Sequence, residues 1–260
     1  MPEKKNRIYW ALSDSYVLTK RSILHITRSF DQLLSAALFP IMFLLLFRYV
    51  LGGAINTGSV SYVNYLIAGI FVQTLAFGAN STTMNLAIDM QKGVVDRFRS
   101  LPMANSSFLI GHIIADLVRN MISAFIILGV GLLVGFMPTA TPVEWLFVFG
   151  MALLFTFAVS WMSAVLGLLV KSVEAAQWIG FVIIFPLTFA SSAFVPTDTM
   201  PGALRFFAEN QPVTQVVSAI RGWLVGTPAG NSGILAVAWL VGIIIVAIPV
   251  SGWLFRRQER

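Results

Sequence analysis

The sequence predicts an all-α integral membrane protein with six transmembrane helices, and its composition supplies the first reason. Hydrophobic residues make up 57% of the 260 residues and charged residues only 11%, whereas a soluble domain carries about 25% charged residues. This composition argues against a water-soluble globule. The second reason is that six segments approach the roughly 20 mainly apolar residues that cross a bilayer.

The rare residue types narrow the chemistry. The chain has no cysteine, so disulfides, thiolate metal sites and cysteine nucleophiles are excluded. Its two histidines leave little room for a histidine-based metal site, and we expect neither a metal nor a catalytic residue in this chain. The first residues, MPEKKNRIYWALSDSY, carry charges without a following apolar stretch, so we expect no cleavable signal peptide.

The first predicted element is an amphipathic helix over Ser13–Gln32. Apolar residues fall on one arc of this helix, and Arg21, His25 and Arg28 fall roughly opposite. Such a helix lies along the inner membrane surface, with its basic face toward lipid headgroups or a protein partner. A generic surface anchor explains the same pattern, because many membrane proteins share it.

Six predicted spans follow within a single transmembrane unit that covers residues 1–260. The spans are Leu33–Leu51, Val63–Ile88, Phe108–Phe136, Trp145–Val170, Ala175–Phe194 and Ile234–Phe255. The third segment exceeds what a bilayer requires, so its first polar turns are expected to project from the membrane.

The distribution of Lys and Arg predicts that both termini are cytoplasmic. With that orientation the outer loops hold only Arg205 and Arg221, and Arg48 and Arg119 lie within spans. The other thirteen of the seventeen basic residues are cytoplasmic: Lys4, Lys5, Arg7, Lys20, Arg21, Arg28, Lys92, Arg97, Arg99, Lys171, Arg256, Arg257 and Arg260. The net charge of +6 therefore reflects membrane topology rather than nucleic-acid binding.

The loop over residues 89–107, DMQKGVVDRFRSLPMANSS, is predicted to dock onto a cytosolic partner. Its basic residues place it on the cytoplasmic side. Val94, Phe98 and Leu101 recur at helical spacing, and Pro102 ends the pattern. A loop that only joined two spans would not need a helix with an apolar face.

The outer connection over residues 195–230 predicts two short helices that fold at or into the outer interface. It is too polar and too rich in proline to span, yet too apolar for a free loop. Pro201 and Pro212 each stand where proline suits a first helical turn. We expect helices near Gly202–Glu209 and Val213–Val225. Aromatic anchors are expected at Phe206, Phe207 and Trp223.

Polar residues within the third span form a second candidate site. His112, Asp116 and Arg119 are spaced by four and three residues, so they share one helical face. One interpretation is a polar gate at the cytoplasmic end, since ionisable residues within spans are costly and usually functional. The alternative is an Asp116–Arg119 ion pair that fixes the helix position near the inner interface.

Two further groups are candidates for a substrate path. Gln73 and Asn80 are seven residues apart in the second span and are expected to face the same way. They could line a path or form hydrogen bonds across a subunit interface. The fifth span carries an aromatic stripe, which suits either packing or a lining for apolar, flat substrates: Trp178, Phe181, Phe185 and Phe189.

The sequence contains no G-x-x-x-x-G-K-[ST] pattern, so it predicts no P-loop ATPase site of its own. H-E-x-x-H and G-x-S-x-G are also absent, and no hydrolase signature supports an intramembrane enzyme.

Two separated segments resemble type-2 ABC transporter permeases, most closely the bacterial branch that exports drugs, polysaccharides or lipids and includes daunorubicin-resistance permeases. The first is GVVDRFRSLPMANSSFLIGHIIADLVR, Gly93–Arg119, similar to the family's cytoplasmic-loop signature. The second, Phe185–Gly226, is similar to the fifth span and paired outer helices of that family. It departs slightly at Asn210-Gln211-Pro212-Val213-Thr214, where the family closes on an N-P-[LV]-T-like phrase. The order of elements matches over nearly the whole chain.

The resemblance implies a permease that works with a separate ABC ATPase subunit, which binds ATP and Mg, and with a second permease copy or a sister permease. It implies that the helix over 13–32 contacts the same ATPase. It also implies a coupling helix seated in the ATPase groove, formed by Gly93, Val94, Asp96, Arg97, Phe98, Arg99, Leu101 and Pro102.

We therefore expect an exporter subunit in a bacterial cytoplasmic membrane that moves a drug, lipid or lipid-linked glycan. An ion-coupled secondary transporter is one alternative, although the charged cluster lies near the inner end of one span rather than at the midplane. A non-transporting membrane scaffold is another.

Overall fold

The structure is a computed structural model that describes residues 30–55, 57, 60–93, 105–170 and 172–257, and every regular element in these ranges is a helix. This confirms the all-α prediction for the part of the chain described. In chain order the helices are α2 (Phe30–Leu46), the π-helical η1 (Phe47–Leu51), α3 (Tyr62–Ala79), α4 (Ser81–Gln91), α6 (Asn105–Leu133), α7 (Pro142–Leu169), α8 (Val173–Phe189), the short 3₁₀ helix η2 (Thr197–Thr199), α9 (Gly202–Asn210), α10 (Pro212–Val225) and α11 (Ser232–Arg257).

Among the described residues, four helical segments are long and apolar enough to cross a membrane: Tyr62–Gln91, Leu109–Leu133, Pro142–Leu169 and Ser232–Arg257. They correspond to the second, third, fourth and sixth predicted spans. Shorter apolar helices occupy Leu38–Leu51 and Val173–Phe189, at the first and fifth. The count of six spans therefore remains a prediction, whereas a membrane protein with several helical spans is supported.

The second predicted span, Tyr62–Gln91 in the structure, is interrupted at one residue, Asn80, whose backbone angles stay in the helical region. α3 ends at Ala79 and α4 begins at Ser81, with Asn80 between them. The Ser81 hydroxyl lies 2.6 Å from the carbonyl oxygen of Gly78 and so satisfies a backbone acceptor at this junction. Local hydrogen bonds from serine side chains compete with the regular helical ladder, which explains why the apolar run alone did not predict the interruption.

The fifth span ends earlier than predicted, at Phe189 instead of Phe194. Pro186 lies inside α8, where its missing N–H weakens the helix. The side-chain amide of Gln211 then donates to the carbonyl oxygens of Leu187 and Ala190, at 2.8 and 2.6 Å. These bonds satisfy carbonyls that a helix end leaves without partners. The glutamine that departs from the family phrase thus caps α8.

The boundary between the predicted surface helix and the first span does not coincide with a break. α2 begins at Phe30, within the expected surface helix, and continues without interruption past Leu33 to Leu46. Pro40 lies inside it. The rest of the predicted surface helix, including Arg21, His25 and Arg28, lies outside the described residues.

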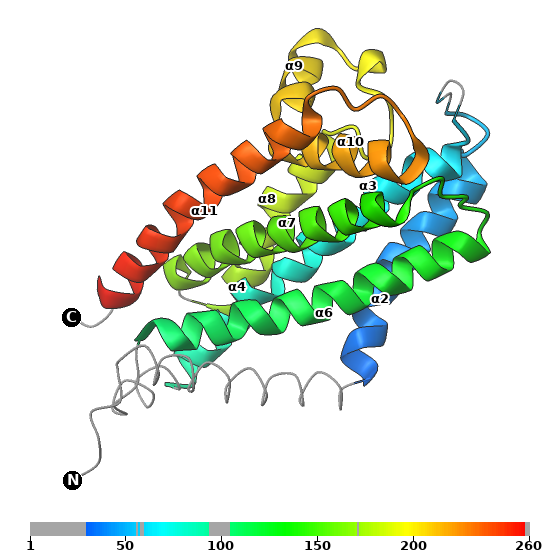
Figure 1. The fold of residues 1–260 in the computed structure, drawn as a ribbon. Helices are drawn as coiled ribbons and strands as arrows, with labels where there is room; N and C mark the ends of the chain where they lie inside the picture. Colours follow the sequence, from blue (N-terminus) through cyan, green and yellow to red (C-terminus); the bar gives the residue numbers. More distant parts are fainter. Residues whose placement is uncertain (1–29, 56, 58–59, 94–104, 171, 258–260) are drawn as a thin grey trace.

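The long helices run roughly side by side, so their ends collect at two ends of the bundle (Figure 1). α9, α10 and the start of α11 lie at one end, together with the C-terminal end of α6 and the start of α7. The C-terminal ends of α4, α7 and α11 lie at the other, where α6 and α8 begin. The described basic residues Lys92, Arg256 and Arg257 therefore share one end, as expected if that end is cytoplasmic.

α3 is the central helix of the described core. It packs against α6, α7 and α10, and its largest fully buried side chains include Leu66, Ile67, Ile70 and Phe71. Within a bilayer such packing stabilises the fold through close van der Waals contact, because lipid tails are as apolar as the side chains. Gly69 shows how close the approach is, since a Cβ there would lie 2.1 Å from the carbonyl oxygen of Ala193.

The outer connection contains two short helices, α9 and α10, whose bounds differ by one residue from those predicted. Phe206 and Phe207 are 72% and 45% exposed, as expected for interfacial anchors. Trp223 differs, because it packs on Phe147 of α7 with ring centroids 5.6 Å apart. Pro212 occupies the first turn of α10, and Gly226 ends that helix at φ 70°, a conformation that suits glycine.

Candidate functional site

The charged strip of α6 contains a buried ion pair at the junction of α3 and α4. Arg119 donates to the Asp116 carboxylate, to the Ser81 hydroxyl and, at 3.2 Å, to the carbonyl oxygen of Gly78. Ser81 Oγ also lies 3.1 Å from Asp116 Oδ1. Asp116 is 1% exposed, and its Oδ2 atom has no hydrogen-bond partner in the described part of the chain. The ion pair joins α6 to this junction.

A second charged contact lies nearer the end of the bundle that carries Lys92. His112 Nε2 of α6 is 3.0 Å from Asp89 Oδ2 of α4, and the two side chains are 21% and 27% exposed. These helices flank the loop that the sequence assigns to docking. His112 therefore does not extend the Asp116 pair as one ladder but joins the two helices beside the loop.

Three amide side chains at the same junction have buried atoms without hydrogen-bond partners among the described residues: both amide atoms of Gln73 and Asn120, and Oδ1 of Asn80. Asn120 lies against Gly78, where a Cβ would meet its Oδ1 at 1.7 Å. Unpaired buried amides are costly, and in functional membrane proteins such groups mark substrate paths or moving contacts.

Gln73 and Asn80 do not share one surface, contrary to the expectation from their spacing. Gln73 lines a cavity between α2, α3 and α6, whereas the Asn80 side chain lies against Gly180 of α8. A Cβ at Gly180 would meet Asn80 Oδ1 at 1.7 Å. Asn80 keeps helical backbone angles, and its N–H donates to the carbonyl oxygen of Ala76, so the two residues differ in the helices that their side chains meet.

The aromatic stripe of α8 is continuous and meets aromatic rings of α2 and α3. Ring centroids of Phe181 and Phe185 are 5.0 Å apart, and those of Phe185 and Phe189 are 4.1 Å apart. Trp178 is 65% exposed and contacts Phe181 edge-on at 6.3 Å. We call the whole set the aromatic seam: Phe39 and Phe43 of α2, Phe47 of η1, Phe77 of α3, Phe181, Phe185 and Phe189 of α8, and Phe194.

Most residues of the predicted coupling loop lie outside the described residues: Val94, Asp96, Arg97, Phe98, Arg99, Leu101 and Pro102. Gly93 is described and has φ 63°, with its N–H donating to the carbonyl oxygen of Met90 at 3.1 Å. That left-handed conformation favours glycine and ends α4 with a turn.

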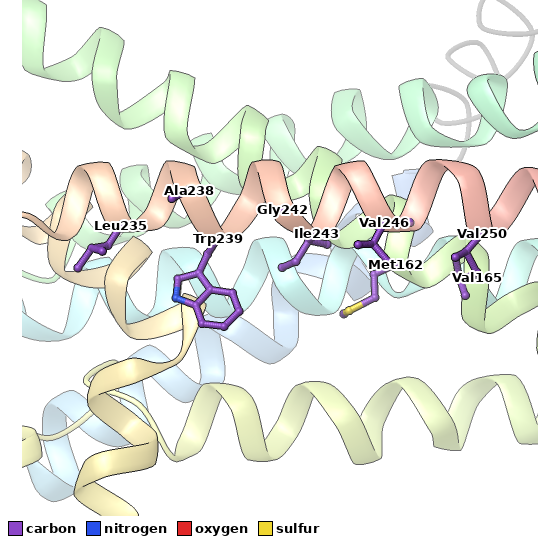
Figure 2. Close-up of a pocket in the computed structure, with 10 residues that line it drawn as sticks. Met162, Val165, Leu235, Ala238, Trp239, Gly242, Ile243, Val246 and Val250 are labelled. Carbon is purple, nitrogen blue, oxygen red and sulfur yellow. The ribbon is translucent and has the colours of Figure 1, made fainter.

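A groove of about 650 Å³ runs along α11 and α7 and was not expected from the sequence. Figure 2 shows Leu235, Trp239, Ile243 and Val246 of α11 along it, with Met162 of α7 at its side. All of these side chains are apolar or aromatic. α11 exposes much of its apolar surface, and the indole N–H of Trp239 is the one side-chain hydrogen-bonding group among the residues drawn along the groove.

Arg221 of α10 is a buried cation that the sequence placed simply in an outer loop. It is 6% exposed and donates to the carbonyl oxygens of Tyr65 and Ser192 at 3.1 and 2.6 Å. Its guanidinium also lies 3.6 Å from the centre of the Tyr65 ring. Burial lowers the pKa of Arg221 to about 10. These contacts attach α10 to the N-terminal end of α3.

The helices and these polar contacts define a polytopic α-helical membrane protein with a polar, ion-paired helix junction beside an aromatic seam. The chain belongs to the ABC-2 type transporter family, whose model matches residues 14–225.

Three relatives show the range of that likeness. The chain is 30% identical, over 88% of its own length and 81% of the relative's, to the daunorubicin resistance ABC transporter permease protein DrrB1 of Streptomyces coeruleorubidus. It is 26% identical to a Mycobacterium tuberculosis H37Rv protein named "Probable doxorubicin resistance ABC transporter permease protein DrrC", over 96% of its own length and 91% of the relative's. It is 27% identical to a Cyanophora paradoxa protein named "Putative transport permease ycf38", over 82% of its own length and 74% of the relative's.

Proposed function

We propose that this chain is the membrane-spanning permease subunit of an ATP-driven exporter that works with a separate ABC ATPase. Family membership supports this proposal, as do relatives that are named permeases. The observation that carries it is a set of polar contacts from α6 to the two helices before the docking loop, made by His112 to Asp89 and by Arg119 to Gly78 and Ser81. Asp89–His112 joins α4 and α6 beside that loop, and Asp116–Arg119 reaches the junction next to the aromatic seam.

The proposed mechanism begins at the coupling loop. Val94, Phe98 and Leu101 pack into a groove of the ATPase, while neighbouring charges set register and association rate rather than most of the affinity. ATP and Mg bind to the partner. When ATP closes the ATPase dimer, the loop moves, and α4 and α6 move with it because the contacts of His112 with Asp89 and of Arg119 with Ser81 join them. Alternating access follows when the junction at Asn80 changes angle.

The proposed assembly contains two permease units in a bacterial cytoplasmic membrane, each with six spans and cytoplasmic termini. α2 and α8 are short as described, but both are apolar, and each is bordered by segments that lie outside the described residues or that turn at the outer end. The outer helices α9 and α10 act as a lid, anchored through Arg221.

The proposed substrate is hydrophobic or amphipathic. The aromatic seam provides a wall for apolar or flat molecules, and two relatives are named for resistance to daunorubicin and doxorubicin. Aromatic walls with a few polar groups are typical of small-molecule sites. The same wall suits a lipid or the lipid part of a glycan.

The chain has no cysteine, so one introduced thiol tests the docking step. A photo-crosslinker on Phe98→Cys in native membranes should capture an ABC ATPase subunit. Gly202→Cys is the control, because Gly202 lies at the opposite end of the bundle in open space. Capture of lipid or of the chain itself by Phe98→Cys, with full labelling, would contradict the docking assignment.

Transport in inside-out vesicles separates the alternatives. The proposed exporter accumulates substrate only with hydrolysable ATP and continues when an uncoupler dissipates the proton gradient. An ion-coupled carrier would stop with the uncoupler, and a scaffold would respond to neither energy source. Phe98→Ala should abolish coupling, since a buried aromatic anchor contributes about 2 kcal/mol or more to such an interface.

A further inference from the structure

A cavity of about 240 Å³ lies between α2, α3 and α6, beside the helix junction. Its walls combine aromatic rings with polar side chains: Phe39 and Pro40 of α2, Gln73 and Phe77 of α3, Ser81 of α4 and Arg119 of α6. A cavity of mixed character inside a helical membrane bundle is a candidate ligand site, because bundle cores hold ligands on side chains from facing helices.

Gln73 is a polar side chain of this cavity whose amide forms no hydrogen bond with the described residues. It is 2% exposed, and neither atom of its amide has a hydrogen-bond partner among the described residues. The neighbouring Thr74 differs, because its hydroxyl donates to the carbonyl oxygen of Ile70 at 2.7 Å within the same helix. Gln73 therefore offers both a donor and an acceptor, and in a site with little water these bonds are worth most to a ligand.

The charge of the cavity selects against ions. Arg119 is its only charged lining residue among those described, and its guanidinium is paired with the Asp116 carboxylate. The pair leaves no net charge to attract an anion. A cation would meet the Arg119 guanidinium, whereas the Asp116 carboxylate is not among the lining residues. The preferred group is therefore neutral.

The aromatic walls specify the rest of the ligand. The rings of Phe39 and Phe77 meet edge-on with centroids 6.2 Å apart, and Phe77 lies 6.1 Å from Phe181 of the aromatic seam. A molecule whose polar group reaches Gln73 would thus lay its apolar body against these rings. Face and edge contacts with aromatic rings favour flat or aromatic bodies over branched ones.

We propose that this cavity binds the neutral hydroxyl, ketone or amide group of an amphipathic molecule through the Gln73 amide, with its apolar body on Phe39 and Phe77. The proposal rests on the proposed export function, since it assigns the polar end of the substrate path. A soluble amphiphile and a membrane lipid with a neutral hydroxyl share this chemistry.

Three pyrene probes of matched size test the proposal with the full chain in lipid nanodiscs. They are 1-hydroxypyrene, pyrene and pyrene-1-sulfonate, and binding is followed as energy transfer from the protein tryptophans. Gln73→Leu should weaken 1-hydroxypyrene binding about five- to tenfold, the effect of one or two hydrogen bonds. Pyrene binding should change less than about twofold, because pyrene makes no hydrogen bond. Gln177→Leu, at an exposed position on α8, is the matched control and should change neither.

Equal binding of 1-hydroxypyrene to the wild type and Gln73→Leu would overturn the site. A larger dependence of the sulfonate on Gln73 would overturn the neutral class. Displacement of 1-hydroxypyrene by diacylglycerol in the discs would identify a membrane lipid as the natural ligand. A lack of displacement would identify a soluble amphiphile instead. Either result supports binding in the cavity. Because binding is read without ATP, loss of ATP-dependent transport with intact Gln73-dependent binding would refute the exporter function alone.

Discussion

Gly180 of α8 provides a sharp test of the packing at the helix junction. A Cβ at this position would lie 1.7 Å from Oδ1 and 2.2 Å from Cγ of Asn80. Ordinary contacts begin at 3.4 Å, so the nearest atom stands at half the required separation. Gly180→Ala therefore requires either a different Asn80 rotamer or a shift of α8 away from the junction.

The expected loss of stability follows from overpacking. Insertion of a methyl group into a tight contact costs about 1–3 kcal/mol, which is partly offset by the better helix propensity of alanine, about 1 kcal/mol over glycine. We expect Gly180→Ala to destabilise the chain by up to about 2 kcal/mol after this offset. Asn80→Ala removes the clashing atoms, so the double variant should recover most of the loss.

Two other glycines calibrate the experiment. A Cβ at Gly69 would meet backbone atoms of Ala193, which no rotamer can move, so Gly69→Ala should cost more than Gly180→Ala. A Cβ at Gly150 of α7 meets nothing within 4 Å, so Gly150→Ala should be neutral or slightly stabilising. Stability is measured as the denaturant or thermal midpoint of the purified chain in one detergent.

Equal stabilities of Gly180→Ala and Gly150→Ala, or a failure of Asn80→Ala to rescue Gly180→Ala, would contradict the close contact between Asn80 and Gly180. The second result would show that the methyl group displaces α8 through some other contact. Because double-mutant cycles isolate the pairwise contribution, the coupling between positions 80 and 180 is the decisive quantity.

Three further predictions use other contacts. Arg119→Leu should lower the free energy of unfolding by about 3–5 kcal/mol because it leaves Asp116 buried and unpaired. The Asp116→Leu/Arg119→Leu double variant should lose less in the same unfolding assay, and equal losses would contradict the ion pair. Lys92→Cys should react with an impermeant maleimide only in inside-out vesicles and Gly202→Cys only in intact cells, and the opposite result would reverse the proposed orientation. Phe185→Leu should reduce ATP-dependent transport of aromatic substrates several-fold with less effect on alkyl substrates, and equal effects in a transport assay would indicate a packing role.

Apolar length predicted most of the helices because a bilayer requires about 20 apolar residues whatever their neighbours are. The outer helices were also predictable, since Pro212 marks the first turn of α10 from local geometry alone. The break at Asn80 could not be predicted from the sequence, because it depends on which side chains pack beside that residue. Neither Ser81 nor Gly180 stands out in the sequence, because their contacts at Asn80 exist only in the folded structure.

The contacts of the site residues also divide into those that the sequence could predict and those that it could not. Asp116 and Arg119 could be paired from sequence because three residues bring them to one helical face. The partner of His112 could not be predicted, since Asp89 lies 23 positions away on another helix. Gln73 could be recognised as a polar residue within a span, yet its cavity depends on Phe39 of α2. Contacts between distant helices require the three-dimensional arrangement, and periodicity in one helix does not contain it.

The break at Asn80 gives the proposed coupling a definite place in which to act. Asn80 is the one residue between α3 and α4, and α4 carries Asp89, whose contact with His112 joins α4 to α6. α6 also packs extensively against α3, so the proposed movement would pass from the loop through α4 and α6 into the core. At the junction the unpaired amide atoms of Asn80 and Asn120 lose no hydrogen bond when the helices separate. The bonds of Arg119 to Ser81 and to the Gly78 carbonyl oxygen would break, so Arg119 sets most of the cost of an opening motion there.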